Sequence, residues 1–352
     1  MSTTKKLYFD SDYMEGAHPL VLQRLAETNL EKTSGYGTDP YTAAAADRIR
    51  AACDALEAEV YFLSGGTQTN ALVIGSLLKP WQGVLCADTG HIATHEAGAI
   101  EWTGHKVMTL PGKDGKIDAQ AIQGALDTFD GDANHDHMVM PGMVYLSLPT
   151  EYGTLYSLSE LEAISGICHE RNIPLYIDGA RLAYALACPE CDVTLADLAR
   201  LCDVFYIGGT KCGALLGEAV VIPKSGLIPH FFTLIKQRGA LLAKGRVTAL
   251  QFDALFTDGL YGRIGENAIR TADAIRKTLS DNGYTFAIDS PTNQIFVALD
   301  DGQKKKLADK VSISFWEKLP DGRTVMRIAT SWATTDEDVE ALCGILKDAA
   351  LR

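Results

Sequence analysis

Residues 204–222 read Val-Phe-Tyr-Ile-Gly-Gly-Thr-Lys-Cys-Gly-Ala-Leu-Leu-Gly-Glu-Ala-Val-Val-Ile. Two apolar, β-prone runs flank a glycine-rich turn in this stretch, and the turn holds a single lysine, Lys211. Burial between strands lowers the pKa of a lysine amine and makes it a nucleophile that forms Schiff bases. A surface lysine at the tip of a hairpin is the simpler interpretation of this stretch alone. The motifs elsewhere in the chain must therefore decide between the two.

The chain upstream of this stretch alternates between short apolar runs, polar turns and helical patterns. The apolar runs lie at 61–63, 84–87, 106–110, 143–148 and 174–177. Helices are expected between them, among them one over 41–60 and one over 159–172, for which Ser157, Ser159 and Glu160 are capping candidates. Such alternation predicts an α/β fold of three layers, in which helices cover both faces of a mostly parallel sheet.

The last hundred residues have a different pattern. A long helical stretch at 265–282 precedes apolar runs at 295–299 and 325–329 and a final helix that begins at Thr335. This mixture predicts a smaller α+β domain. We therefore expect three parts: an N-terminal arm and helix that joins the small domain (1–20), a large domain (21–260) and a small C-terminal domain (261–352).

The composition is that of an ordinary globular protein of 352 residues, of which 47% are hydrophobic and 22% charged. The net charge of −13 argues against nucleic-acid and anionic-membrane partners. The sequence contains no pattern typical of a signal peptide or a membrane span, so we expect a cytoplasmic protein with reduced cysteines. Cys188 and Cys191 form one Cys-x-x-Cys pair, but no second pair follows at zinc-site spacing, so no metal is expected.

The sequence Ser64-Gly-Gly-Thr-Gln68 follows the first apolar run and opens a helical pattern. Glycines allow the backbone to close on an anion, and the amides at a helix N-terminus bind phosphate. An ordinary strand-to-helix turn is the alternative, and the spacing does not match a nucleotide-binding P-loop. This segment is a candidate phosphate site only if other residues support it.

Asp178 ends an apolar run in the sequence Leu175-Tyr-Ile-Asp-Gly-Ala-Arg181, 33 residues before Lys211. Ligands bind at the carboxyl ends of the strands in sheets of this type, so both side chains are expected at one edge, on adjacent strands. A pyridoxal phosphate (PLP) site requires such a pair, a Schiff-base amine and a carboxylate beside the pyridine nitrogen. An ion pair between Asp178 and Arg181 is the alternative, and Arg181 also suits bidentate carboxylate binding.

His91 lies in a third polar segment, together with His95 and Glu96. An imidazole there would stack on an aromatic cofactor or act as a base, and a solvated loop histidine is the alternative. The three residues do not form the H-E-x-x-H arrangement of zinc-binding helices. The polar stretch 131–137 is expected to form an exposed loop.

These motifs together resemble the low-specificity L-threonine aldolase and β-eliminating lyase family of PLP-dependent enzymes, which have the fold type I, aspartate aminotransferase-like architecture. The resemblance runs across nearly the whole chain. It is carried by Tyr36-Gly-Thr-Asp-Pro40, Phe62-Leu-Ser-Gly-Gly-Thr-Gln-Thr-Asn70, Gly90-His91, Glu96-Ala-Gly98, Ile177-Asp-Gly-Ala-Arg181, Gly209-Thr-Lys211 and Arg327.

The resemblance implies a role for each matching residue. Lys211 would hold PLP as an internal aldimine, Asp178 would keep the ring nitrogen protonated, and His91 would stack on the ring. The other cofactor contacts would come from Gly65, Gly66, Thr67, Ala180, Arg181 and Thr210. The amino acid substrate would be held by Ser11, Tyr36, Arg181 and Arg327. Tyr36 would reach the site of a second subunit, because sites in this family form at subunit interfaces, and we expect a homodimer or homotetramer.

The implied reaction is a retro-aldol cleavage of a β-hydroxy-α-amino acid, threonine or allo-threonine, to glycine and acetaldehyde. β-Elimination, transamination and racemisation on the same scaffold stay open, as does a non-catalytic binder of a phosphorylated ligand. Pro149-Thr-Glu-Tyr-Gly153 replaces the family's common Asn-Thr-His-Asn stretch. The usual Met-Arg-Gln phosphate segment is not evident, so Lys244 and Arg246 are candidates for its role. The family's second histidine would be His135 or His137, or would be absent.

Overall fold

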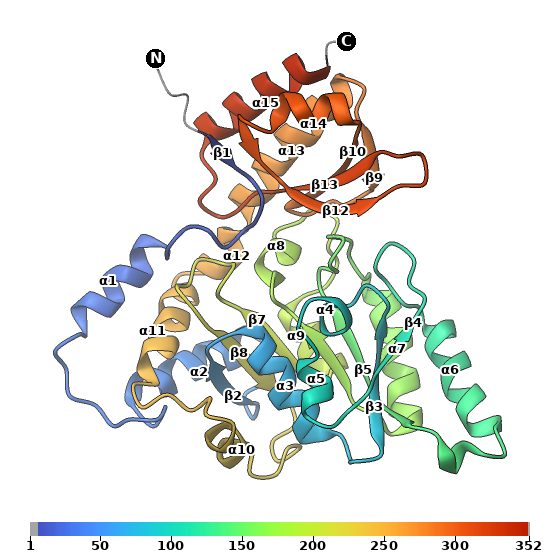
Figure 1. Ribbon diagram of the computed structural model, residues 1–352. Helices are drawn as coiled ribbons and strands as arrows, with labels where there is room; N and C mark the ends of the chain where they lie inside the picture. The colour runs from blue at the N-terminus through green and yellow to red at the C-terminus, as the bar shows by residue number, and fades with distance from the viewer. Residues whose placement is uncertain (1–5, 351–352) are drawn as a thin grey trace.

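Seven strands form the central sheet of this computed structural model, which describes residues 6–350 (Figure 1). Their order across the sheet is β2 (Glu59–Leu63), β8 (Glu218–Ile222), β7 (Val204–Gly208), β6 (Leu175–Asp178), β5 (Met140–Ser147), β3 (Gln82–Ala87) and β4 (Val107–Leu110). Neighbouring strands pair in parallel except for the two pairs that include β8. The predicted mostly parallel sheet is therefore confirmed.

The side chains of each central strand alternate between two hydrophobic cores. On β7, for example, Phe205 and Ile207 belong to one core, and Val204 and Tyr206 belong to the other. The first core is covered by α2 (Pro40–Ala52), α6 (Ala119–Gly131), α7 (Leu158–Arg171), α9 (Leu195–Leu201) and α11 (Arg246–Leu255). The second is covered by α3 (Gly66–Leu77), α5 (Ala99–Trp102) and α10 (Phe231–Gln237). Strand side chains have a period of two, so a sheet buried on both faces yields the three layers that the sequence predicts.

Local signals set the ends of these helices. Ser157 caps α7, and the side chain of Glu160 completes a capping box there, as expected. The predicted helix over 41–60 is wrong in its second half, because α2 ends at Ala52. Asp54 has a positive φ of 49°, a left-handed backbone that cannot continue the helix. The chain then turns directly into β2. The remaining short helices are α1 (Pro19–Glu27), α4 (His91–Thr94), α8 (Leu182–Leu186), α12 (Leu260–Ile264) and the 3₁₀ turn η1 (His135–His137).

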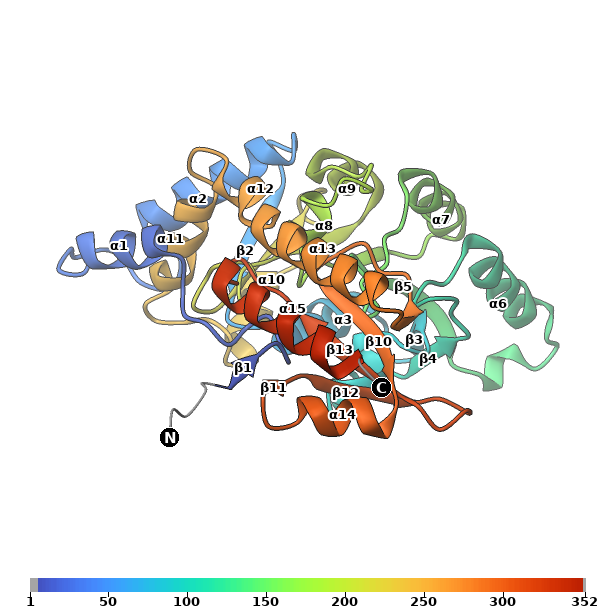
Figure 2. The same cartoon turned by 90° about the horizontal axis from the view of Figure 1, so that it is seen from above.

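A four-stranded antiparallel sheet forms the upper part of the molecule in Figure 1. Its order is β12 (Ser314–Lys318), β13 (Thr324–Ala329), β10 (Gln294–Leu299) and β9 (Thr285–Ile288), and a third core joins it to α13 (Glu266–Asp281), α14 (Asp301–Leu307) and α15 (Asp336–Ala350). The short β1 (Leu7–Tyr8) pairs in parallel with β11 (Val311–Ser312), so the N-terminal arm lies beside this sheet (Figure 2). The domain limits at 20/21 and 260/261 stay a prediction.

The described part of the chain contains no helix with the length and apolar character needed to cross a bilayer. All eight cysteines have free thiols. Residues 6–350 contain no group of three or more histidine, cysteine, aspartate or glutamate side chains arranged to hold a metal ion. The cytoplasmic location stays a prediction.

Candidate active site

The carboxyl ends of the parallel strands meet at one edge of the central sheet, and the predicted cofactor residues gather there. Ser64 follows β2, Asp178 ends β6 and Lys211 follows β7. A cavity of about 340 Å³ at this edge is lined by all nine residues expected to contact the cofactor: Gly65, Gly66, Thr67, His91, Asp178, Ala180, Arg181, Thr210 and Lys211. Lys211 and Asp178 therefore face one enclosed space, as adjacent strand ends predict.

Asp178 is buried, and both of its carboxylate oxygens are hydrogen-bonded. The hydroxyls of Tyr145 and Tyr206 donate to it at 2.6 and 2.5 Å, the Asn70 amide donates at 3.1 Å, and a backbone N–H two residues on donates at 2.9 Å. Burial raises the pKa of Asp178, but the charge of His91 and these hydrogen bonds outweigh it and lower the pKa. The group therefore stays ionised at neutral pH, the state that pairs with a protonated ring nitrogen.

A chain of hydrogen bonds connects Asp178 to His91. Nδ1 of His91 lies 2.7 Å from Oε1 of Glu96, and the same oxygen accepts a 2.7 Å bond from the Asn70 amide that also reaches Asp178. Oε2 of Glu96 is buried and has no partner among residues 6–350. This chain fixes the orientation of the His91 ring. Asn70 and Glu96 lie in motifs of the family, but no role in the site was predicted for either residue.

The lysine turn is held by a buried carboxyl group from the neighbouring strand. Glu218 on β8 accepts hydrogen bonds from Oγ1 of Thr210 at 2.8 Å and from the N–H of Gly209 at 3.0 Å. Burial raises the pKa of Glu218 to about 7. Burial and the nearby charge of Arg181 lower the pKa of Lys211, which favours the neutral, nucleophilic amine. Glu218 lies in the same stretch as Lys211, residues 204–222, but its role was not predicted from the sequence.

The glycine turn leaves room for an anion. Gly65 is the N-cap residue of α3, and a Cβ built on it would meet no atom within 4 Å. Any side chain there would enter the cavity, beside the free amides of the helix N-terminus. At Gly66, a Cβ would lie 3.1 Å from the Tyr206 hydroxyl. A phosphate cradle, a reactive amine and a buried carboxylate together are the donor set that fits PLP.

A second cavity of about 560 Å³ adjoins the first and opens between the central sheet and the small sheet. It shares Lys211 and Arg181 with the first and adds Arg327 from β13. Arg181 forms two hydrogen bonds to the Asp12 carboxylate, at 2.6 and 3.1 Å. Among the described residues, Arg327 donates to neutral acceptors, the amide oxygen of Gln294, the backbone carbonyl of Asp10 and the hydroxyl of Ser314, and its buried Nε has no partner there. Arg327 is therefore a cation available to a carboxylate ligand.

Besides Lys244 and Arg246, four predicted or candidate side chains line neither cavity. The Oγ of Ser11 is buried without a partner among residues 6–350, although Arg327 binds the carbonyl of the preceding residue. Tyr36 packs its ring 4.3 Å from the Lys236 ammonium. His135 and His137 lie on η1 before β5, whereas Ser147 at the other end of that strand lines the first cavity. Neither histidine therefore reaches the site within this chain.

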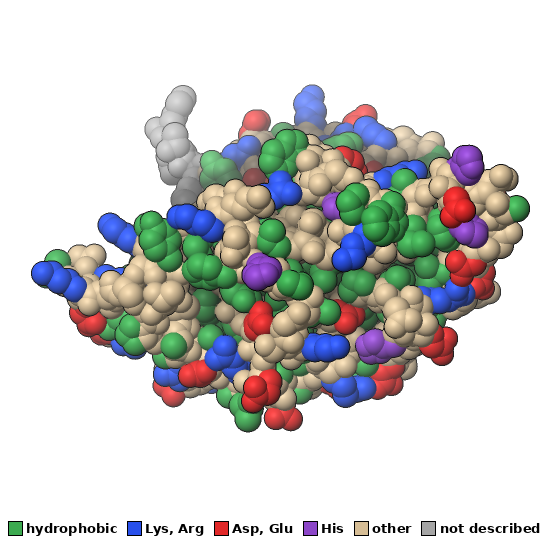
Figure 3. Space-filling model, turned by 90° about the horizontal axis from the view of Figure 1, so that it is seen from below, with side chains coloured by type: hydrophobic (Ala, Val, Ile, Leu, Met, Phe, Trp, Pro, Cys, Tyr) green, Lys and Arg blue, Asp and Glu red, His purple; other side chains and the backbone are tan. Residues whose placement is uncertain are grey.

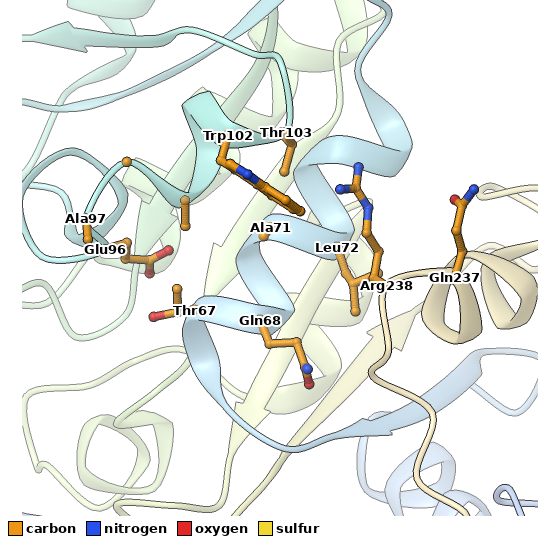
Figure 4. Close-up of a pocket in the computed structure, with 12 residues that line it drawn as sticks. Thr67, Gln68, Ala71, Leu72, Glu96, Ala97, Trp102, Thr103, Gln237 and Arg238 are labelled. Carbon is orange, nitrogen blue, oxygen red and sulfur yellow. The ribbon is translucent and has the colours of Figure 1, made fainter.

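Another hollow, of about 920 Å³, lies on the far side of the glycine turn (Figure 4). It shares Thr67 and Glu96 with the first cavity, and Trp102 on α5 faces Arg238, whose guanidinium carbon lies 5.4 Å from the indole ring. Its lining contains no lysine, so it offers no Schiff-base amine.

Arg246 was a further candidate for the phosphate. Its guanidinium binds the backbone carbonyl of Asn29 at 3.3 Å.

The β-eliminating lyase family matches residues 9–312. The low-specificity L-threonine aldolase of Pseudomonas aeruginosa is 30% identical over 97% of this chain and 97% of its own length, and that of another Pseudomonas strain is 30% identical over 98% of both. The threonine aldolase of Leishmania major is 42% identical, covers 98% of this chain and 99% of its own, and superposes with a TM-score of 0.94. Thermus thermophilus aspartate aminotransferase shares the fold at 14% identity, with a TM-score of 0.74. The chain therefore belongs to the β-eliminating lyase family and is a PLP-dependent lyase of the aspartate aminotransferase-like fold.

Proposed function

We propose that the protein cleaves a β-hydroxy-α-amino acid, threonine or allo-threonine, to glycine and acetaldehyde. The observation that carries this proposal is one continuous site in which Lys211 and Asp178 face one cavity and Arg327, which has no acidic partner among residues 6–350, faces the next. The names of the Pseudomonas and Leishmania relatives support the same reaction.

The residues that would hold PLP are Lys211 at its aldehyde carbon, Asp178 at its ring nitrogen, and the turn Gly65, Gly66 and Thr67 at its phosphate. Bound PLP supplies an electron sink for the pair released when the Cα–Cβ bond breaks. The ionised Asp178 maintains the positive charge that makes this sink effective. His91, oriented by Glu96, is proposed to lie on the face of the ring.

The chain's other residues would bind and orient the substrate. Arg327 would take the carboxylate, because its guanidinium has no acidic partner among the described residues and a planar fork suits a carboxylate. Arg181 would assist through the nitrogen that Asp12 does not occupy. Ser11 lies next to the residue whose carbonyl binds Arg327, so its unpaired hydroxyl is a third candidate. A base in the cavity must remove the β-hydroxyl proton.

Replacement of the reactive amine tests the proposal. Lys211→Ala is expected to lose both the visible absorbance of the bound cofactor and the release of acetaldehyde from threonine, because no other amine lines the first cavity. Lys224→Ala, at an exposed lysine after β8, should retain both. Full absorbance and turnover in Lys211→Ala would contradict the proposal, and pyruvate release from serine without acetaldehyde release from threonine would indicate β-elimination instead.

Assembly into a homodimer or homotetramer is part of the proposal. Tyr36 lies outside the cavities of its own chain, which suits a side chain that completes the site of a second subunit. Large apolar side chains are also exposed, among them Leu30 and Trp102, which are 92% and 77% exposed. The face in Figure 3 carries apolar side chains between intermingled acidic and basic ones. Such surface supports a contact between copies.

A further inference from the structure

Glu151 lies at the junction of the two cavities and lines both of them. It follows β5, four residues after Ser147. Lys211 also lines both cavities, whereas Arg327 lines only the outer one. A substrate that reaches Lys211 and Arg327 at the same time must occupy this junction. Its β-carbon then lies within the space that Glu151 faces.

Within residues 6–350, the hydrogen bonds that other residues donate to the Glu151 carboxyl both go to one of its two oxygens. Oε1 accepts a hydrogen bond from the backbone N–H of His91 at 2.9 Å and another from the hydroxyl of Ser147 at 2.6 Å. Both bonds end on Oε1, which leaves Oε2 to a molecule in the cavity. Burial raises the pKa of Glu151, and the hydrogen bond from Ser147 offsets this only in part. The carboxyl group therefore accepts a proton more readily than an exposed glutamate does.

The other groups that line both cavities are poorer bases for this position. Lys211 is the amine that would hold the cofactor, and Arg181 has no proton-accepting form in proteins. Tyr13 is 56% exposed, so water competes for its hydroxyl. His91, whose Nδ1 is bonded to Glu96, is the residue that would lie on the face of the cofactor ring.

We infer that Glu151 is a further catalytic residue, whose Oε2 takes the proton from the β-hydroxyl of the substrate. This inference rests on the proposed function. The O–H bond breaks toward Oε2, the β-carbon and its oxygen form the aldehyde C=O bond, and the Cα–Cβ bond breaks. Its electron pair passes to the electron sink that PLP supplies. Cα gains one proton to yield glycine, and Glu151 returns its own proton to solvent, so the overall reaction is balanced.

The test separates removal of the β-hydroxyl proton from binding of the amino acid and from exchange of its α-proton. Glu151→Gln keeps an oxygen that accepts the bonds from His91 and Ser147 but cannot take a proton. Threonine cleavage is expected to fall by about 10²-fold or more, the lower end of the usual contribution of a general base. Glycine has no β-hydroxyl, so the rate at which its α-proton exchanges with deuterated water and its dissociation constant should stay within about threefold of wild type. The thermal midpoint of the variant should stay within a few degrees of wild type. Glu101→Gln, at an exposed glutamate on α5, is the matched control.

A second measurement uses the protein without bound cofactor. In protein without cofactor, the infrared carboxyl band that Glu151→Gln removes should titrate above the ordinary glutamate value of about 4.3. The charged groups that line the same two cavities are Asp88, His91, His95, Glu96, Asp178, Arg181, Lys211, Glu218, Glu317 and Arg327. Titration at or below that value would overturn the inference.

Three kinetic outcomes decide the inference. Loss of threonine cleavage alone supports it, whereas turnover within about threefold of wild type, or a parallel loss of cleavage and glycine exchange, overturns it. Glu151→Asp keeps a carboxyl group, so its turnover should be at least about tenfold higher than that of Glu151→Gln. Equal loss of turnover in the two variants would also overturn the inference. A wild-type protein that exchanges the α-proton of glycine but releases no acetaldehyde from threonine would instead contradict the proposed function.

Discussion

Asp178 and Arg327 lie on opposite sides of one site and differ in how completely their polar groups are paired. Asp178, on the large sheet, accepts four hydrogen bonds from fixed donors. Arg327, on the small sheet, has a buried Nε without a partner among residues 6–350, and the nearby hydroxyls of Ser11 and Thr89 are also buried and unpaired there. The carboxylate of Asp178 is therefore fully paired before any ligand binds, and the guanidinium of Arg327 is not.

This difference shows where a ligand contributes to the structure. A buried polar group without a partner costs about 1–3 kcal/mol, so a molecule that pairs with it recovers that free energy on binding. A complete hydrogen-bond shell instead keeps a carboxylate in one position and charge state. We therefore expect changes on the cofactor side to affect turnover and changes on the substrate side to affect affinity.

The largest effect should follow from removal of the charge at Asp178. Asp178→Asn keeps the shape of the side chain but removes the anion that pairs with the ring nitrogen. We expect kcat to fall by about 10²–10³-fold, the usual loss when one electrostatic group of a reaction centre is removed. The thermal midpoint, cofactor absorbance and steady-state kinetics of the purified variant would measure it.

Asp203 provides the matched control for that variant. Its carboxylate accepts a 2.8 Å hydrogen bond from the N–H of Leu175, at the end of β6 opposite to Asp178. Asp203→Asn should leave kcat within about twofold, because an amide oxygen accepts the same bond and no cavity residue is altered. Similar losses of kcat in both variants would mean that the sheet, and not the charge at the cofactor, is affected.

A stability effect of intermediate size is expected from the ion pair of Asp12 with Arg181. Both side chains are buried, and Asn293 also donates to Asp12 at 2.9 Å. Asp12→Asn should reduce the free energy of unfolding by about 3 kcal/mol, because it leaves Arg181 buried without its partner. Asp127→Asn, in a half-exposed surface pair with Arg171, should cost less than about 1 kcal/mol. Urea unfolding of the three proteins measures both values.

The same pair predicts the acid sensitivity of the fold. Burial alone would raise the pKa of Asp12, but Arg181, Lys211 and the hydrogen bonds outweigh it and lower the pKa to about 2. The unfolded value is about 3.9, so this carboxylate contributes about 2.6 kcal/mol of stability above about pH 4 and loses it as the pH falls toward about 2. Asp12→Asn should lack this part of the decline, and an unchanged decline would contradict the prediction.

Local sequence signals predicted most of the fold and the centre of the site. Apolar runs mark the strands, and the rule that ligands bind at strand ends placed Asp178 and Lys211 at one edge. The expected helix over 41–60 was too long, because Asp54 gives no obvious breaking signal yet adopts a left-handed backbone. Element ends depend on such single-residue conformations, which composition does not reveal.

The hydrogen-bond partners of the site could not be predicted, because they are distant in sequence. Asn70 and Asp178 are 108 residues apart, and Asp12 and Asn293 are 281 residues apart. Only the packing of the strands and the arm brings such pairs together. Glu151 and Glu218 lie in segments that the sequence singles out, but their burial depends on the complete fold. That burial determines their chemistry.

The smallest of these effects should come from the substrate side. Arg327→Lys keeps a positive charge but loses the planar fork that binds a carboxylate through two hydrogen bonds. Loss of one charged hydrogen bond, about 1.5–3 kcal/mol, should raise KM for threonine by about tenfold to a hundredfold, with a smaller change in kcat. Arg323→Lys, beside Asp321 in the exposed turn of the same hairpin, is the control and should change neither constant. If Arg327→Lys instead lowered kcat as strongly as Asp178→Asn and left KM unchanged, the two sides would not divide their roles between turnover and affinity.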